Sequence, residues 1–279
     1  MPTKVVTEVD TFLKQKVLGS GDLADSEKAP FSKNSQFEVL EYAPDRNQHV
    51  LLMLAQPVIA KDGKTQLNKV YAYHPHLKIE GDSQVIKLPV PYRSQLDNDD
   101  SIFGPGWRQC NTTSNTMLAD YLLDGELTQK AKAQGFPEPE SVYMRIVTKY
   151  GDTTDHNAQT QALQELGIES YFSHTLSSQD ILTSLKASIP VVVGFAYKGS
   201  GHICVIVGYD PDKQSWLVHD PYGTRHGASD SYDVGVGGAY DVYSNSVMQQ
   251  IFWDLGGEAG WGRIVTSVKG KSTGLAAGL

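Results

Sequence analysis

The spacing of hydrophobic and polar residues changes at about residue 90. Before that point the apolar residues come in short runs, such as 37–40 and 50–54, and Pro-Asp and Asp-Gly turn signals separate them. Short apolar runs between turn residues are typical of β-strands. The pattern predicts a small β-rich domain over residues 1–84, with a linker at 79–87.

Beyond residue 92 the apolar residues recur at helical spacing, and Ser177 is a typical N-cap for a further helix. The segments with helical spacing are 117–122, 142–147 and 158–166. Later apolar runs lack this spacing and predict buried strands at 190–197, 203–209 and 215–218. The Asp-Pro-Asp turn between the last two strands predicts an antiparallel hairpin.

The last third of the chain contains a Gly-rich stretch, 223–238, with few apolar residues. A segment with little to bury predicts a long, partly mobile loop. Two apolar groups follow at 251–253 and 262–265 and are predicted as late strands or edges. The fold class expected from the whole pattern is α+β, with helices packed on an antiparallel sheet over residues 85–279.

Composition narrows the classes of function that this chain can have. Of the 279 residues, 40% are hydrophobic and 20% are charged, which is ordinary for a globular protein. The net charge of -8 and the scattered Lys and Arg residues argue against a nucleic-acid binder. No apolar stretch reaches the roughly 18 residues of a membrane span. The N-terminal segment also lacks the apolar core that a signal peptide has after its first positive residue. We therefore expect a soluble protein without membrane insertion, made in the cytoplasm without a signal peptide.

Only two cysteines occur, Cys110 and Cys204, so neither a disulfide framework nor a structural zinc site is expected. Cys110 directly precedes the first helical segment of the second domain. A helix N-terminus stabilises a thiolate and so lowers the pKa of the cysteine thiol, which is roughly 8.5 in free cysteine. The helix amides can also donate to an oxyanion. Cys110 is thus a candidate nucleophile.

A thiolate nucleophile needs a base, and His202 opens a predicted strand after small residues that leave room for a substrate. The imidazole in turn needs an acceptor for its other ring nitrogen. Asp220 ends the neighbouring strand of the predicted hairpin, so pairing can bring the two side chains together. The sequence predicts a Cys110–His202–Asp220 constellation.

Four segments look like the successive motifs of the C39-like, papain-like cysteine peptidases. They are residues 90–98, 109–118, 201–202 with 207–210, and 220–223. Their order and spacing agree with the family over about residues 88–266. One departure is Cys110-Asn111, where relatives commonly have Cys-Gly, so the resemblance does not define the fine shape of the pocket.

The resemblance implies a papain-like fold and cysteine-peptidase activity without a cofactor. It also implies that Gln95, the glutamine upstream of the nucleophile, helps to form the oxyanion hole. Gln109 is a weaker candidate because it abuts the nucleophile. The N-terminal segment, with 10–14 and 73–76, resembles SH3-like modules of bacterial and phage cell-wall enzymes.

Three functions remain open at this point. The first is a phage endolysin or bacterial cell-wall hydrolase that acts on peptidoglycan peptides after its release from the cytoplasm. The second is a cytoplasmic peptidase that processes proteins or propeptides. The third is a non-catalytic virion or binding protein with a papain-like fold.

Several further residues have a structural interpretation beside the functional one. Cys204 would share a strand face with His202, which can place it near the site, but it is interpreted as core filler. His219 is expected to point to the other face from Asp220 and is not favoured as the base, and His156 is interpreted as part of a loop or helix cap. Trp253 and Trp261 either line a substrate groove or pack in the core. The acidic run with Asp97, Asp99 and Asp100 could bind calcium, but it lacks the glycine and distal glutamate of an EF-hand loop, which favours a solvated turn.

Overall fold

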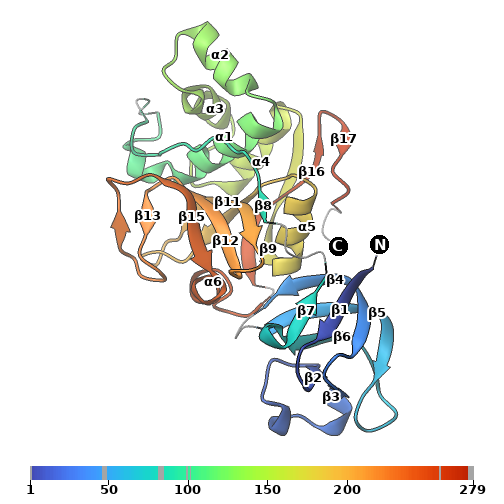
Figure 1. Ribbon diagram of the computed structural model, residues 1–279. Helices are drawn as coiled ribbons and strands as arrows, with labels where there is room; N and C mark the ends of the chain where they lie inside the picture. Colours follow the sequence, from blue (N-terminus) through green and yellow to red (C-terminus); the bar gives the residue numbers. More distant parts are fainter. Residues whose placement is uncertain are drawn as a thin grey trace. The chain divides into compact units, whose positions relative to one another are not determined.

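The computed structural model describes residues 2–45, 49–80, 85–98, 100, 102–257 and 259–275. The chain divides into two compact units. One comprises Met1–Gln84 with Pro211–Gln214, and the other comprises Val85–Asp210 with Ser215–Leu279. Figure 1 follows the chain through both units from blue to red.

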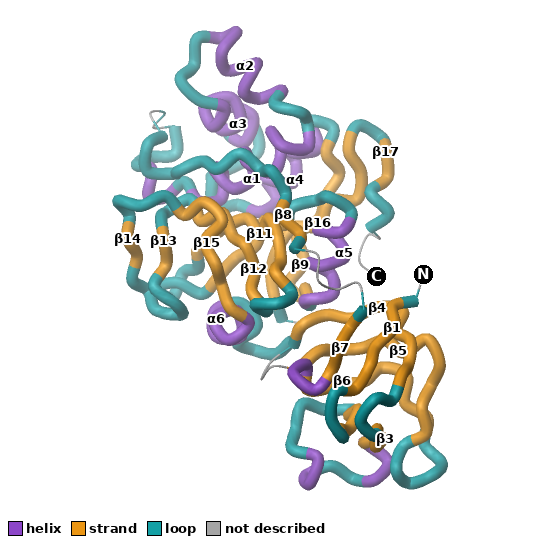
Figure 2. The backbone as a smooth tube through the Cα atoms, in the orientation of Figure 1, coloured by secondary structure: helices purple, strands orange, loops and turns teal. Residues whose placement is uncertain are grey.

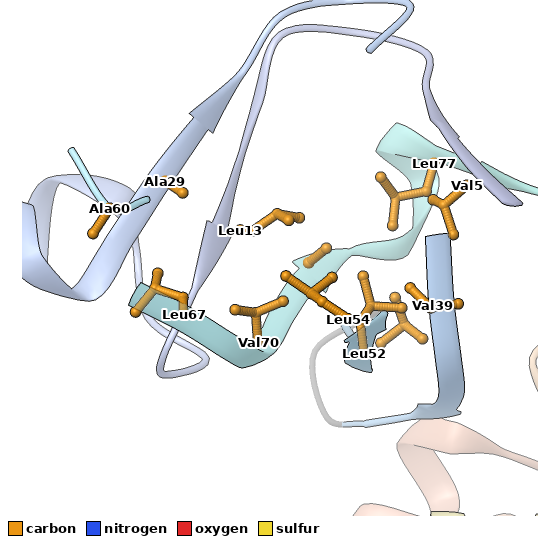
Figure 3. Close-up of a cluster of buried hydrophobic side chains, with 12 residues drawn as sticks. Val5, Leu13, Ala29, Val39, Leu52, Leu54, Ala60, Leu67, Val70 and Leu77 are labelled. Atoms are coloured by element: carbon orange, nitrogen blue, oxygen red, sulfur yellow. The ribbon is translucent and has the colours of Figure 1, made fainter. Parts of the chain in front are cut away.

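The first unit is built on a seven-stranded antiparallel sheet with the strand order β3-β2-β6-β5-β4-β1-β7. Its strands are β1 (Thr3–Thr7), β2 (Thr11–Lys14), β3 (Lys28–Phe31), β4 (Gln36–Pro44), β5 (His49–Ile59), β6 (Gln66–Tyr73) and β7 (Leu77–Ile79). Alternate positions face the core, as at Leu52 and Leu54, which are buried between half-buried neighbours. Figure 3 shows the resulting cluster of buried aliphatic side chains. The predicted β-rich region is confirmed, and its likeness to SH3 modules stays a prediction.

The second unit contains an eight-stranded sheet with the order β15-β12-β11-β10-β16-β17, to which β8 adds beside β11 and β9 beside β16. The strands are β8 (Ile86–Lys87), β9 (Ile168–Leu176), β10 (Val191–Phe195), β11 (His202–Asp210), β12 (Ser215–Asp220), β15 (Gly238–Ser244), β16 (Gly260–Val268) and β17 (Lys271–Ser272). Every residue of β10 and β11 is buried, which explains their nearly continuous apolar sequence. The central strands are therefore a rigid base for the side chains they carry.

The α-helices of the described residues belong to the second unit, and the purple segments that Figure 2 shows in the first unit are short 3-10 helices. The α-helices are α1 (Cys110–Leu122), α2 (Glu126–Gln134), α3 (Pro139–Val147), α4 (His156–Glu165), α5 (Ser178–Lys186) and α6 (Asn245–Ile251). Helix α1 packs on β11 and β10, and the Ser114 hydroxyl donates a 3.0 Å hydrogen bond to the Ile203 carbonyl. The α+β class is confirmed. Within the described part of the chain, no helix is long and apolar enough to span a membrane.

Three local predictions are wrong. Residues 251–253 are not a strand: Ile251 ends α6, whose first turn is capped by Ser244 through a 3.3 Å bond from the Val247 N–H. The Gly-rich stretch is not wholly a loop, since β13 (Thr224–Arg225) and β14 (Tyr232–Asp233) pair within it. The linker ends in β8, which pairs with β11, while residues 81–84 lie outside the described part of the chain.

Candidate active site

Cys110 is the first residue of α1, as the sequence predicts. As a residue it is partly buried. Burial raises the pKa of a thiol, but a hydrogen bond with His202 and the positive charge of the imidazolium outweigh that effect, and the pKa of Cys110 lies below its ordinary value. Cys110 lies in the first turn of α1, where the backbone N–H groups of a helix have no intrahelical partner and can stabilise a nearby negative charge. The thiol is thus poised to ionise.

His202 and Asp220 lie on the adjacent strands β11 and β12. The imidazole Nε2 is 2.7 Å from the carboxylate Oδ1 of Asp220. Burial disfavours a charged imidazole, yet the negative charge of Asp220 and its hydrogen bond raise the pKa of His202 well above the ordinary value. With Nε2 occupied by Asp220, Nδ1 is the ring nitrogen left to face Cys110. The three side chains that the sequence predicts to converge are brought together in one site.

Asp220 is fully buried and accepts hydrogen bonds from three uncharged donors besides His202. These donors are the Tyr222 N–H at 2.9 Å, the Tyr232 hydroxyl at 3.0 Å and the Tyr243 hydroxyl at 2.8 Å. Burial alone would raise the pKa of this carboxyl. The charge of His202 and the four hydrogen bonds prevail, so the pKa of Asp220 is lowered and the group stays ionised.

Three tyrosine rings surround the imidazole of His202. The ring centroids of Tyr197, Tyr222 and Tyr232 lie 5.8, 5.9 and 5.8 Å from that of His202, and the tyrosine rings also contact one another. The imidazole is only 4% exposed as a result. Because water is excluded on this side, the attraction between His202 and Asp220 is screened less than on a surface.

Gln95 and Gln109 are both buried, but they use their amides differently. The Gln95 Nε2 donates a 3.0 Å bond to the Gly106 carbonyl in the turn before Cys110, and its Oε1 has no partner. Gln109 uses its whole amide for structure. Its Oε1 accepts from Asn98 at 2.6 Å, and its Nε2 donates to the carbonyls of Asp100 and Gly104. Of the two, only Gln95 retains an amide hydrogen that the structure does not assign.

A family model described as the Peptidase_C39 like family matches residues 87–251, more than half of the chain. The chain belongs to this family. The resemblance to C39-like cysteine peptidases is confirmed by this match. Among solved structures, the chain is similar to the peptidase domain of Streptococcus ComA, a bifunctional ABC transporter involved in a quorum-sensing pathway. That likeness covers 64% of this chain and 97% of the other at 14% identity, with a TM-score of 0.38. No curated protein matches the chain.

The second cysteine of this C39-like peptidase lies beside the same imidazole. The Cys204 sulfur, a ring nitrogen of His202 and a carboxylate oxygen of Asp220 all lie within 4.8 Å of one another. Cys204 is fully buried, and both burial and the charge of Asp220 raise the pKa of its thiol. It fills the core as predicted, and it lies beside His202 and Asp220, as a shared strand face allows.

His219 is held away from the site, as its position next to Asp220 predicts. Its Nε2 donates to the Val90 carbonyl at 2.8 Å, and its Nδ1 accepts from the Tyr240 N–H at 3.0 Å. Burial lowers its pKa, so the ring is a neutral cross-link between segments. Both nitrogens are occupied, and His219 is not available as a base.

Trp261 lies next to the site, whereas Trp253 does not. Trp253 is buried and donates its indole N–H to the Leu176 carbonyl at 2.9 Å. Trp261 is half-buried, and its ring covers Gly201, the residue before His202, so closely that a Cβ there would meet the indole at 2.8 Å. His156 begins α4, where its ring stacks on Phe172 at 3.7 Å.

The acidic run at residues 97–100 does not form a cluster of carboxylates among the described residues. Asp97 is exposed, and the Asp100 carboxylate pairs with Arg145. Asp99 lies outside the described part of the chain.

Proposed function

We propose that this C39-like peptidase hydrolyses amide bonds with Cys110 as nucleophile, His202 as general base and acid, and Asp220 as the residue that orients the imidazole. The observation that carries the proposal is the chain of contacts from the Cys110 thiol through His202 to a buried, ionised carboxylate. Each of the three pKa directions favours the charged form that the reaction needs.

The reaction begins with attack of the Cys110 thiolate on the carbonyl carbon of the scissile amide, which forms the C–S bond. His202 then gives its Nδ1 proton to the leaving amine as the C–N bond breaks. The now neutral His202 then deprotonates a water molecule, whose oxygen attacks the thioester; the C–S bond breaks, the carboxylic acid product leaves, and the Cys110 thiolate and the protonated His202 are restored. Asp220 holds the ring by Nε2 throughout both steps. We propose no cofactor and no calcium for this chemistry.

The developing oxyanion is assigned to the Cys110 backbone N–H and the Gln95 side-chain amide. The bond from Gln95 to the Gly106 carbonyl keeps this amide beside the turn that leads into α1. The second Nε2 hydrogen of Gln95 is the donor that we assign to the oxyanion. Gln109 is excluded from this role because its amide is saturated by the loop around it.

As substrate we propose the peptide portion of peptidoglycan, which would make the protein a phage endolysin or a bacterial cell-wall hydrolase that acts after release from the cytoplasm. A small β-rich domain before a peptidase domain suits the combination of binding and cleavage. Purified peptidoglycan is incubated with the protein, and the soluble products are identified by mass spectrometry. New peptide ends that are absent with Cys110→Ala are the expected result.

Alkylation tests the reactivity of Cys110 independently of the substrate. Limiting iodoacetamide at pH 7 should modify Cys110 in the native protein and leave the buried Cys204 unmodified, as peptide mass spectrometry can read out. Equal, slow modification of both thiols would contradict the peptidase proposal and favour a binding protein. Rapid modification of Cys110 without peptidoglycan products, but with cleavage of a protein substrate, would contradict the cell-wall proposal alone.

A further inference from the structure

The first unit contains a cavity of about 590 Å³ that is unrelated to the peptidase site. It opens between the start of β2, the loop that follows β2, and the facing ends of β5 and β6. Its walls combine apolar side chains with polar groups that converge from three strands. The residues that line it and carry the argument are Thr11, Phe12, Lys14, His49, Tyr73 and His76. The volume lies within the range of roughly 300–1,000 Å³ of small-ligand sites.

Lys14 is the unusual member of this lining. It is the last residue of β2 and only 8% exposed, although a lysine is seldom buried without an anionic partner. Its ammonium donates to the Leu18 carbonyl at 2.8 Å and contacts His49 Nε2 at 2.8 Å. Both partners are uncharged, because an ammonium can only donate and His49 Nε2 therefore accepts as a neutral imidazole. Burial correspondingly lowers the pKa of Lys14.

The positive charge of Lys14 is thus left without a counter-charge. No carboxylate of the described residues forms an ion pair with it. Asp10 lies at the exposed edge of the cavity, where its Oδ1 accepts the Lys33 N–H at 2.7 Å. An ammonium has three N–H bonds and two are used, so one donor and one full charge remain for whatever fills the cavity.

The unpaired charge of Lys14 favours an anionic ligand, and the other walls of the cavity indicate which chemical group would carry the anion. The rings of His49 and Tyr73 are 5.6 Å apart, and those of Tyr73 and His76 are 4.8 Å apart, so they form a continuous aromatic row. Thr11 Oγ1 hydrogen-bonds His76 Nδ1 at 3.0 Å on the same side. Phe12 provides an apolar wall. Flat rings with hydroxyl and imidazole edges suit an amide plane with a small aliphatic side chain.

We propose that this cavity binds the terminal carboxylate of a peptide or N-acylated amino acid, with the carboxylate on Lys14 and the adjacent amide against the row of His49, Tyr73 and His76. A single carboxylate matches the single charge of Lys14, whereas a phosphate dianion would carry an unmatched second charge. The site is separate from the proposed catalytic chemistry, so it stands or falls independently of it.

The test uses the full chain with N-acetylalanine and Ala-Ala-Ala as probes, and titration calorimetry and amide chemical shifts as readouts. The neutral N-acetylalanine amide is the ligand control. Both acids are expected to bind with shifts confined to the cavity, and the amide is expected to bind about tenfold more weakly or worse, since a hydrogen bond to a charged group is lost. Binding by N-acetylalanine alone would identify free acids as the source, and binding by both would include peptide ends.

Lys14→Met removes the charge and keeps the apolar stem, and Lys16→Met is the matched control two residues along. Lys16 is exposed and pairs with Glu27 outside the cavity. Lys14→Met should lower the affinity for the acids about tenfold or more, whereas Lys16→Met should bind like the wild type. Equal binding of acid and amide by the wild type, no binding of either acid, or full affinity in a folded Lys14→Met protein would each overturn the proposal. The ligand comparison needs no variant, so it decides the matter even where Lys14→Met does not fold.

Discussion

Asp220→Asn is the substitution that isolates charge from geometry in the proposed active site. The asparagine Oδ1 can still accept from His202 and Tyr222, and its amide group can donate to the hydroxyl oxygens of Tyr232 and Tyr243, which can rotate. The shape and the number of hydrogen bonds are therefore preserved. Only the negative charge beside the imidazole is lost, and we expect the protein to fold.

The size of the effect follows from the pair geometry. At the low end, a charge-assisted hydrogen bond exceeds a neutral one by about 1 kcal/mol. At the high end, two charges about 4 Å apart at an effective dielectric of about 20 attract by about 4 kcal/mol. At about 1.4 kcal/mol per pKa unit, the pKa of His202 should fall by roughly one to three units. The imidazolium that protonates the leaving amine is then lost at a correspondingly lower pH.

The assay is the pH profile of kcat/KM on a cleavable peptide, from about pH 5 to 10. In the wild type the basic limb reports loss of the His202 proton, which Asp220 delays to high pH. In Asp220→Asn this limb should move down by one to three pH units, and at a pH on the wild-type basic limb kcat/KM should fall roughly 10- to 1,000-fold, or tenfold per unit. Asp233→Asn makes the same chemical change at an exposed site and should leave the profile unchanged. A basic limb that stays in place in a folded Asp220→Asn protein would refute the reasoning.

Three further predictions concern buried and strained positions. Desolvation raises the pKa of the buried Glu140 from its ordinary value of 4.5 to about 8, so the folded state loses stability as pH rises between these values. Glu140→Gln should therefore raise the free energy of unfolding, measured by urea denaturation, by about 1–3 kcal/mol at pH 7 but by little at pH 4.5. Tyr243→Phe deletes a 2.8 Å bond to the buried carboxylate of the site and should lower that free energy by about 1.5–3 kcal/mol at pH 7; an unchanged midpoint would contradict this. Gly201→Ala places a Cβ 2.8 Å from Trp261 at a φ of +86° and should lower kcat/KM up to about 100-fold. Gly199→Ala is the control: its φ of +71° brings a similar backbone strain, but its Cβ meets no neighbour, so most activity should be retained.

The sequence was sufficient to predict the parts of the site that depend on local order. Cys110 precedes a segment with helical spacing, so its place at the start of α1 follows from periodicity. His202 and Asp220 stand at the ends of two strands joined by a tight turn, and antiparallel pairing then brings their side chains together. These positions need only the pairing of neighbouring segments.

The partners of Asp220 could not be predicted in the same way. Tyr232 comes from the Gly-rich stretch, which has too few apolar residues to indicate structure, and Tyr243 comes from β15, whose alternation is weak. Each reaches the carboxylate through a contact that no local pattern encodes. The same holds for Lys14, whose burial depends on residues 35 and more positions away. Sequence periodicity defines elements, whereas these contacts depend on how distant elements pack.

The two cysteines show why position decides which thiol is reactive. Both lie beside His202, and burial opposes ionisation in each. Cys204 faces the Asp220 carboxylate, so a thiolate there would meet a negative charge, and it has no exposure to a substrate. Cys110 stands at a helix N-terminus with His202 as its hydrogen-bond partner, and as a residue it is only partly buried. The chemistry assigned to Cys110 therefore follows from its surroundings, since the identical side chain two residues after the base is held protonated.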